Sequence, residues 1–359
     1  MSWSRWRKGH QKVRDSRNDK EDATLPQELV DEFMSYLHDT SANLKACALV
    51  CQSVLVYSPA SPPHLINHIQ TLILHRDPEF EVEEFEKFCN LPFTQLENVS
   101  IFHHFSPLTL RSATALQRLF RLPSLLLVEM QCSSLEPEAF PVIWDCSPTI
   151  RHLQLYRWDH SPDSFHPSQR HSSASIVLES LKLENVYGLE GWLNDALCPF
   201  DISQLAVLSF GIHNSVLDWR RIEPAFQTIQ ALEFTISDKR DQGVVADLSL
   251  FPNLLFLRMQ IHGLDATRAL STLSTLTPSS RICQNVFHIP TPTSENCGQL
   301  HFKVAGLSLQ HLQTVGLEMD PKLYDRWAKT FPRLRSRNLL YCSDDDWFQT
   351  QIRRRKSLQ

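Results

Sequence analysis

The sequence predicts an α/β protein in which a short all-helical unit precedes a long solenoid of parallel strands. Three observations predict this fold. An apolar-x-x-apolar-x-apolar pattern recurs along most of the 359 residues, its copies follow one another at a nearly constant interval, and the stretches between copies carry apolar residues at helical spacing. One strand and one helix per repeat stack into a solenoid with parallel strands on its concave side and helices outside.

The two ends of the chain are polar and basic. Residues 1–23 contain seven Lys and Arg residues and almost no apolar ones, which predicts a disordered basic arm. Residues 343–359 are predicted to be a polar basic tail, and their run from Arg353 to Lys356 resembles a short nuclear-import signal. The chain begins without an apolar signal region and contains no run of about 18 apolar residues, so we expect a cytoplasmic or nuclear protein that does not enter a membrane.

Residues 24–65 are predicted to form the all-helical unit. Thr24 is a suitable helix cap, and Leu29 and Phe33 begin an apolar series at four-residue spacing. A second apolar stretch covers residues 44–55 and ends before a group of prolines, which cannot donate backbone hydrogen bonds. About forty residues cannot bury much surface alone, so this unit is expected to need a neighbour.

Residues 66–342 carry the repeats. Successive first positions of the pattern lie 24 to 29 residues apart up to Leu254, and 58 residues separate Leu254 from the next clear copy, with a degenerate copy at Cys283/Val286 midway. Leu334 with Leu339 is a candidate for a frayed last copy. This period lies in the range of leucine-rich repeats. The first positions of the clear copies are Ile69, Leu96, Leu125, Ile150, Leu178, Leu205, Ile229, Leu254 and Leu312.

Helices are expected between the strands, and residues 160–175, rich in Ser, His and Pro, are expected to form a loop. The predicted helical stretches are 82–91, 113–122, 189–197, 265–276 and 321–331.

Composition argues against several classes of function. A net charge of −5 does not suit a general nucleic-acid binder, and the 9 glycines form no phosphate-binding loop. The nine cysteines lack any CxxC pair, which indicates reduced thiols and no zinc site. The sixteen histidines form no HExxH motif, and His104, His213 and His262 share one repeat position that favours a role in turns. We therefore predict no catalytic residue, no metal and no cofactor.

Residues 25–55 resemble the F-box motif. The matching residues are Leu25-Pro26-Gln27-Glu28-Leu29, then Phe33 and Leu37, then the run Leu-Lys-Ala-Cys-Ala-Leu-Val-Cys at 44–51. With the repeats that follow, nearly the whole chain resembles the fungal F-box/leucine-rich-repeat proteins, strongly at 25–55 and loosely beyond. One departure is Val54, which stands where the family usually has Trp.

The resemblance implies a substrate-recruiting adaptor of a Skp–cullin–F-box E3 ubiquitin ligase rather than an enzyme. Its F-box would bind a Skp-type adaptor and, through it, a cullin. The repeats would hold a target protein near a ubiquitin-conjugating enzyme. The expected adaptor-binding residues are Leu25, Pro26, Leu29, Phe33, Leu44 and Val50.

The target surface is expected on the concave side of the solenoid. The apolar residues of each strand point into the core, so the alternate residues face the concave surface. Aromatic and Arg side chains there are the types that most often anchor interfaces. The candidate substrate-binding residues are His152, Tyr156, Lys182, Phe256 and Arg258.

The sequence can be compared with three alternative functions. A non-ligase F-box/leucine-rich-repeat interaction scaffold is compatible with Val54. A receptor for a small molecule or inositol phosphate would need a cluster of cations, and only Lys182 and Arg258 lie on the predicted stripe. A hydrolase or transferase has no supporting motif.

Overall fold

The computed structural model divides the chain into two units, Met1–Tyr57 and Ser58–Gln359, and every described residue belongs to the second. The six predicted adaptor-binding residues, the basic arm and residues 160–174 of the predicted loop lie outside the described residues. The described residues are 66–76, 82–103, 108–132, 136, 139, 142, 145–157, 175–186, 193, 198–211, 219–237, 245–262, 267–288, 304, 310–318, 328–329, 331–343 and 347–358.

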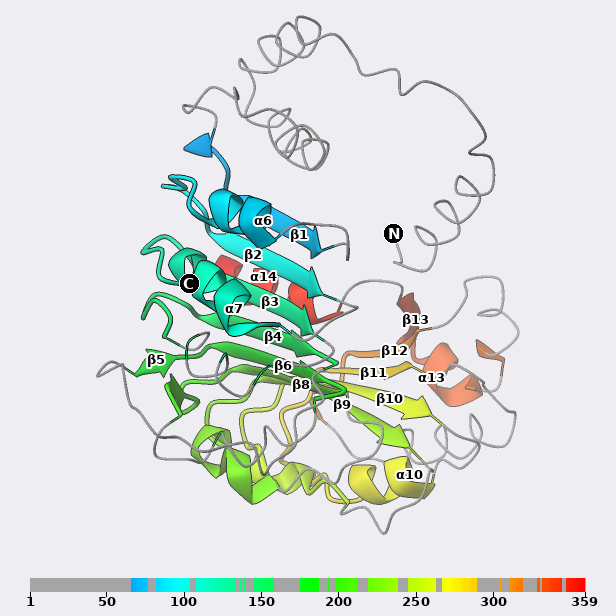
Figure 1. Ribbon diagram of the computed structural model, residues 1–359. Helices are drawn as coiled ribbons and strands as arrows, with labels where there is room; N and C mark the ends of the chain where they lie inside the picture. Colours follow the sequence, from blue (N-terminus) through cyan, green and yellow to red (C-terminus); the bar gives the residue numbers. More distant parts are fainter. Residues whose placement is uncertain are drawn as a thin grey trace, which may run out of the picture. The chain divides into compact units, whose positions relative to one another are not determined.

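An eleven-stranded sheet organises the second unit, and each strand pairs in parallel with its neighbours. The order β1-β2-β3-β4-β6-β8-β9-β10-β11-β12-β13 follows the sequence, so each turn of the chain adds one strand beside the last (Figure 1). A separate pair joins β5 (Ile176–Val177) to β7 (Phe200–Asp201). The predicted mixed α/β class with a large parallel sheet is confirmed. The strands are β1 Thr71–Arg76, β2 Asn98–His103, β3 Leu127–Cys132, β4 His152–Tyr156, β6 Ser180–Glu184, β8 Val207–Gly211, β9 Ala231–Ser237, β10 Phe256–His262, β11 Gln284–His288, β12 Thr314–Glu318 and β13 Leu340–Ser343.

Helices connect several of these strands on one side of the sheet, as Figure 1 shows for α6 and α7. The helices predicted at 82–91, 113–122 and 265–276 are confirmed as α6, α7 and α10. The other two predicted stretches, 189–197 and 321–331, lie mostly outside the described residues. The connections after β8 and β9 contain 3₁₀ turns. The helical elements are α6 Val82–Cys89, α7 Leu110–Phe120, η2 Trp219–Ala225, η3 Leu248–Leu250, α10 Thr267–Leu273, α13 Pro332–Ser336 and α14 Trp347–Leu358.

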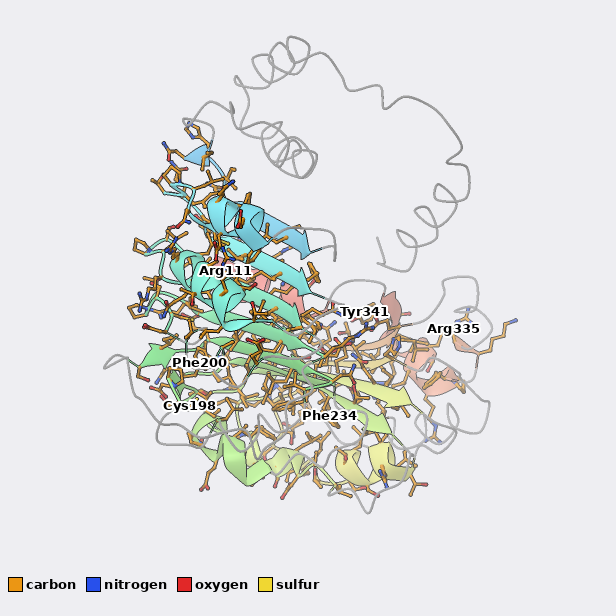
Figure 2. The ribbon with its side chains drawn as sticks, viewed as in Figure 1. Arg111, Cys198, Phe200, Phe234, Arg335 and Tyr341 are labelled. Carbon is orange, nitrogen blue, oxygen red and sulfur yellow. The ribbon has the colours of Figure 1, made fainter. Side chains whose placement is uncertain are left out.

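A hydrogen-bonded N-cap residue, Thr109, marks the start of α7. Thr109 has extended backbone angles, and its Oγ1 accepts a hydrogen bond from the Ser112 backbone N–H at 3.3 Å. The buried face of α7 then packs into the same apolar core as the strand leucines. On the outer face, Arg111 of α7, labelled in Figure 2, pairs with Glu86 of α6. The helices thus cover one face of the sheet.

The core repeats the pattern seen in the sequence. The parallel register aligns the second pattern residue of each strand with that of the next, for example Leu72 with Val99 and Leu232 with Leu257. All four are buried in one continuous cluster. Each repeat therefore closes the core left open by the one before it.

The register corrects the predicted pattern in the last repeats. Asn285 pairs with Leu257, so the degenerate copy begins one residue before the predicted Cys283. A polar residue at a leucine position hid the correct alignment. The last strand places Leu340 beside Val315, so the predicted Leu334/Leu339 copy is also wrong. Leu334 is instead a buried residue of α13.

Hydroxyl side chains link successive turns of the chain at the start of several strands. In each case a Ser or Thr stands immediately before the first pattern residue and donates to the carbonyl of the previous repeat's first pattern residue. This satisfies a backbone acceptor where the chain bends. The bonds are Ser124 Oγ to Leu96 O at 2.8 Å, Thr149 Oγ1 to Leu125 O at 2.9 Å and Thr228 Oγ1 to Leu205 O at 2.8 Å.

The C-terminal segment is not the simple polar tail that its composition predicts. Residues 347–358 form the helix α14, in which Phe348 and Ile352 are buried, with exposed fractions of 1% and 5%. They form a small cluster with strand residues that is separate from the main core. The spacing of four puts both side chains on one face of the helix. The adjoining run of cations concealed this apolar pair.

Among the described residues, no helix is both long and apolar enough to cross a membrane.

Candidate functional site

The inner face of the sheet is defined here as the face opposite the main core, formed by the residues that alternate with the buried pattern residues. All five predicted substrate-binding residues lie on it: His152 and Tyr156 on β4, Lys182 on β6, and Phe256 and Arg258 on β10. The register places their strands within one continuous ladder. The alternation of the strands explains this common placement.

Arg258 is the centre of a buried ion network on the inner face. Its guanidinium pairs with Glu233 on β9 and also with Glu318, whose Oε2 accepts from Arg258 Nε at 2.8 Å. Glu318 lies on β12, so Arg258 extends across β11 to reach it. Glu233 is 1% exposed and accepts further hydrogen bonds from Ser209 at 2.7 Å and Gln260 at 2.6 Å. A planar guanidinium between two carboxylates holds both in fixed positions.

The pKa of Glu318 is lowered. Burial acts in the opposite direction and would raise the pKa by disfavouring the charged carboxylate, but a hydrogen bond from His288 and the positive charge of Arg258 outweigh it. His288 Nδ1 lies 3.5 Å from Glu318 Oε1, and this contact is an ion pair when the imidazole is protonated. Glu318 is therefore held as a carboxylate.

A second polar group lies at β4 and β6. His152 Nδ1 and Ser180 Oγ are 2.8 Å apart, and the Tyr156 hydroxyl donates to Gln154 Oε1 at 2.8 Å. The Lys182 ammonium lies 5.1 Å from the centre of the Tyr156 ring and 3.8 Å from a Glu184 oxygen. These contacts fix the aromatic and cationic side chains that the sequence marked as candidates.

Tyr341 lies at the other end of the inner face, on β13 (Figure 2). Its hydroxyl accepts a hydrogen bond from Gln284 Nε2 of β11, so the side chain extends across β12. Gly316 of β12 makes this approach feasible, because a Cβ there would lie 2.8 Å from Tyr341 Cζ.

The helix α14 covers the middle of the inner face. Phe348 and Ile352 pack with Val207 of β8, Ala231 of β9 and Val286 of β11, and the partly buried Phe256 and Tyr341 border this cluster. Figure 1 shows α14 on the opposite side of the strands from α6 and α7. The Lys182 ammonium lies 5.7 Å from the centre of the Phe348 ring. One predicted substrate-binding residue, Lys182, therefore already contacts α14, and a second, Phe256, borders the cluster that α14 helps to form.

Sequence reasoning missed Phe348, Ile352 and Tyr341, although one signal was available. An aromatic residue followed four positions later by a β-branched one is the spacing of an apolar helix face. It also missed that Glu233 and Glu318 pair with Arg258, since these partners lie on strands 25 and 60 residues away in sequence.

Metal-ligand geometry and thiol reactivity can be assessed for the described residues. No group of three or more His, Cys, Asp or Glu side chains among them could hold a metal ion. Burial raises the pKa of the Cys89 thiol to about 12, so at neutral pH it is a protonated thiol rather than a nucleophilic thiolate. The inner face can bind through its charges, aromatic rings and apolar cluster.

In comparisons with known proteins, no protein-family model and no curated protein matches this chain.

Proposed function

We propose that this chain is a substrate-recruiting adaptor of a Skp–cullin–F-box E3 ubiquitin ligase, with an F-box at residues 24–65 and a leucine-rich-repeat domain that binds a target protein. The observation that carries the proposal is the combination of the Leu-Pro-x-Glu-Leu motif at 25–29 with an unbroken ladder of one parallel strand per repeat. The motif supplies the expected adaptor contact. The ladder supplies a long face for a protein target.

The inner face supports the second half of this proposal. It presents aromatic rings, fixed charges and an apolar cluster across strands from β4 to β13. Interfaces commonly have this composition, with aromatic and Arg anchors surrounded by polar groups. The chain itself performs no chemistry in this scheme; it raises the local concentration of the target near an enzyme.

The test is co-purification of the full chain with a Skp-type adaptor. The expected result is a stable complex that Leu29→Asp abolishes, because the substitution places a charge on the apolar face of the predicted adaptor contact. Val245→Asp is the matched control: the residue is 39% exposed and lies in the repeat region, so the complex is expected to persist. A folded wild-type chain that fails to bind the adaptor would sink the ligase role.

A non-ligase interaction scaffold is the second candidate. Val54 in place of the family's usual Trp favours it, since a smaller side chain offers less apolar surface to the adaptor. It predicts target binding through the repeats without an adaptor complex. The same co-purification distinguishes the two candidates.

A receptor for a phosphorylated small molecule is disfavoured by the charges observed. Arg258 is neutralised by Glu233 and Glu318, and Lys182 lies close to Glu184. Binding a phosphate there would require these carboxylates to release their partners.

A further inference from the structure

We propose that the middle of the inner face is a helix-binding groove, that α14 is its internal occupant, and that the target protein binds by displacing α14 with a helix of the same anchor pattern. This inference rests on the proposed function only in assigning the inner face to the target. The occupancy of the groove by α14 is a property of the chain alone.

The occupied site has the features of helix-in-groove recognition. Two anchors at positions i and i+4, Phe348 and Ile352, enter an apolar cluster formed by Val207, Ala231 and Val286 of three strands. The strands themselves belong to repeats that end well before α14 begins in the sequence. The groove is therefore built by one part of the fold and filled by another.

The contact also has features of an exchangeable one. Among the α14 side chains that the structure describes, the buried apolar ones are Phe348 and Ile352, and a twelve-residue helix has marginal stability without tertiary support. Gln351, between the two anchors, is 3% exposed, and its Oε1 has no hydrogen-bond partner among the described residues. Gln154 Nε2 on the inner face is a buried donor without a hydrogen-bond partner in the described part of the chain. A competing helix that lacked a buried unpaired group at the position of Gln351, or that paired with Gln154, would bind better.

The groove defines the chemistry of its partner. The first anchor is aromatic, because the Lys182 ammonium lies near the Phe348 ring and favours a π face. The second anchor is aliphatic, because its neighbours are the short apolar side chains of the cluster. We therefore assign the target a helical segment with an aromatic residue followed four positions later by Ile, Leu or Val.

The probe is a fluorescent peptide of residues 344–359, added to full-length protein. In wild-type protein the tethered α14 competes as though present at about millimolar concentration. The double variant Phe348→Asp/Ile352→Asp removes both anchors and opens the groove. We expect it to bind the peptide at least tenfold more tightly than the wild-type chain does. A peptide carrying the same two Asp substitutions is expected not to bind.

The matched control is Arg353→Glu, which changes the charge of the same helix by the same amount at an exposed position. Its affinity for the peptide is expected to equal that of the wild-type chain. Equal affinity of the double variant and the wild type would overturn the proposal. Tight binding by the control would overturn it as well, since charge rather than anchor loss would then open the site.

A structural role for α14 has a separate signature. If the double variant and the milder Ile352→Ala both lose cooperative thermal unfolding, α14 is an obligatory part of the core and displacement is excluded. If only the double variant loses cooperative unfolding, the peptide experiment is done with Ile352→Ala instead. The Ile352→Ala chain must then bind the peptide more tightly than the wild-type chain does. Neither measurement uses a Skp-type adaptor, so failure here is distinguishable from failure of the ligase role.

Discussion

Arg258 is the residue on which the charge balance of the inner face depends. Replacing it with Met would leave Glu233 almost fully buried without its cation, and Glu318 would lose a second partner. Breaking a buried pair in this way costs about 3–5 kcal/mol, so the free energy of unfolding should fall by that amount in urea titrations. Arg281→Met is the control, because Arg281 is exposed and bonds only to Asn253 among the contacts described, at 3.1 Å. A loss no larger than that of the control would contradict the network.

Glu318 makes the stability of the protein sensitive to acid. Its folded pKa is lowered, so the carboxylate contributes stability that is complete above its unfolded pKa of about 4.3 and is lost as pH falls through the folded value. Glu318→Gln should therefore weaken the fall in unfolding free energy between pH 6 and pH 3. Glu86→Gln should change that fall less: a hydrogen bond from Arg111 also lowers the pKa of Glu86, but that pair lies at the surface, where solvent screens it. Identical pH profiles for Glu318→Gln and wild type would refute this assignment.

At the scale of single elements, β12 depends on a glycine for the side chain that crosses it. Gly316→Ala places a Cβ 2.8 Å from the Tyr341 ring, which is held by Gln284 and borders the α14 cluster. We expect a loss of about 1–3 kcal/mol in thermal unfolding. Gly211→Ala provides the comparison: its Cβ would meet Glu184, whose side chain is 44% exposed and can turn aside. Equal effects of the two substitutions would mean that the Tyr341 ring also moves freely.

The strand β11 carries a defect in the repeat pattern. Asn285 occupies a leucine position with an exposed fraction of 1%, and neither its Oδ1 nor its Nδ2 has a hydrogen-bond partner in the described structure. Asn285→Leu removes two buried unpaired groups and restores the pattern, so it should raise the unfolding free energy by about 1–3 kcal/mol. Asn90→Leu, at an exposed helix end, should bring no such gain. Destabilisation by Asn285→Leu would indicate that the amide has a bound partner.

The same residue shows where prediction from sequence succeeds for elements and where it fails. The strands whose pattern residues are all apolar, such as β9 and β10, were predicted in the observed register because burial of alternate residues determines it. Asn285 broke that signal and displaced the predicted copy by one residue. The helix α14 was missed because its burial depends on residues of three strands far earlier in the chain, Val207, Ala231 and Val286.

For the whole molecule, the sequence predicted which face of the sheet holds the candidate site, but not that α14 covers that face. Alternation along the strands placed Lys182, Phe256 and Arg258 on one side of the sheet, which is a local property of each strand. The pairing of Arg258 with Glu318 and the docking of α14 arise only when distant repeats stack. The sequence therefore indicated which residues face inward, and the stacked fold determines which of them remain accessible.

The docking of α14 also changes how stability is distributed along the stack of repeats. In such a stack each repeat contacts only its neighbours, so the end strands β1 and β13 should open most readily. Tyr341 of β13, however, borders a cluster that includes α14 and residues of β8, β9 and β11. The cluster that α14 completes thus links the last repeat to the middle of the sheet. Amide hydrogens of β13 should consequently exchange more slowly than those of β1 in the wild-type chain.

Phe348→Asp should remove the difference in exchange rate between β13 and β1, because it separates α14 from the cluster while leaving the strand ladder intact. Hydrogen exchange followed by mass spectrometry should show faster exchange in β12 and β13 and unchanged exchange in β1 and β2. Arg353→Glu should leave both ends as they are in the wild type. Equal acceleration at both ends would mean that the substitution destabilises the whole sheet. The helix would then act as part of the core, and its role as a displaceable occupant of the inner face would be excluded.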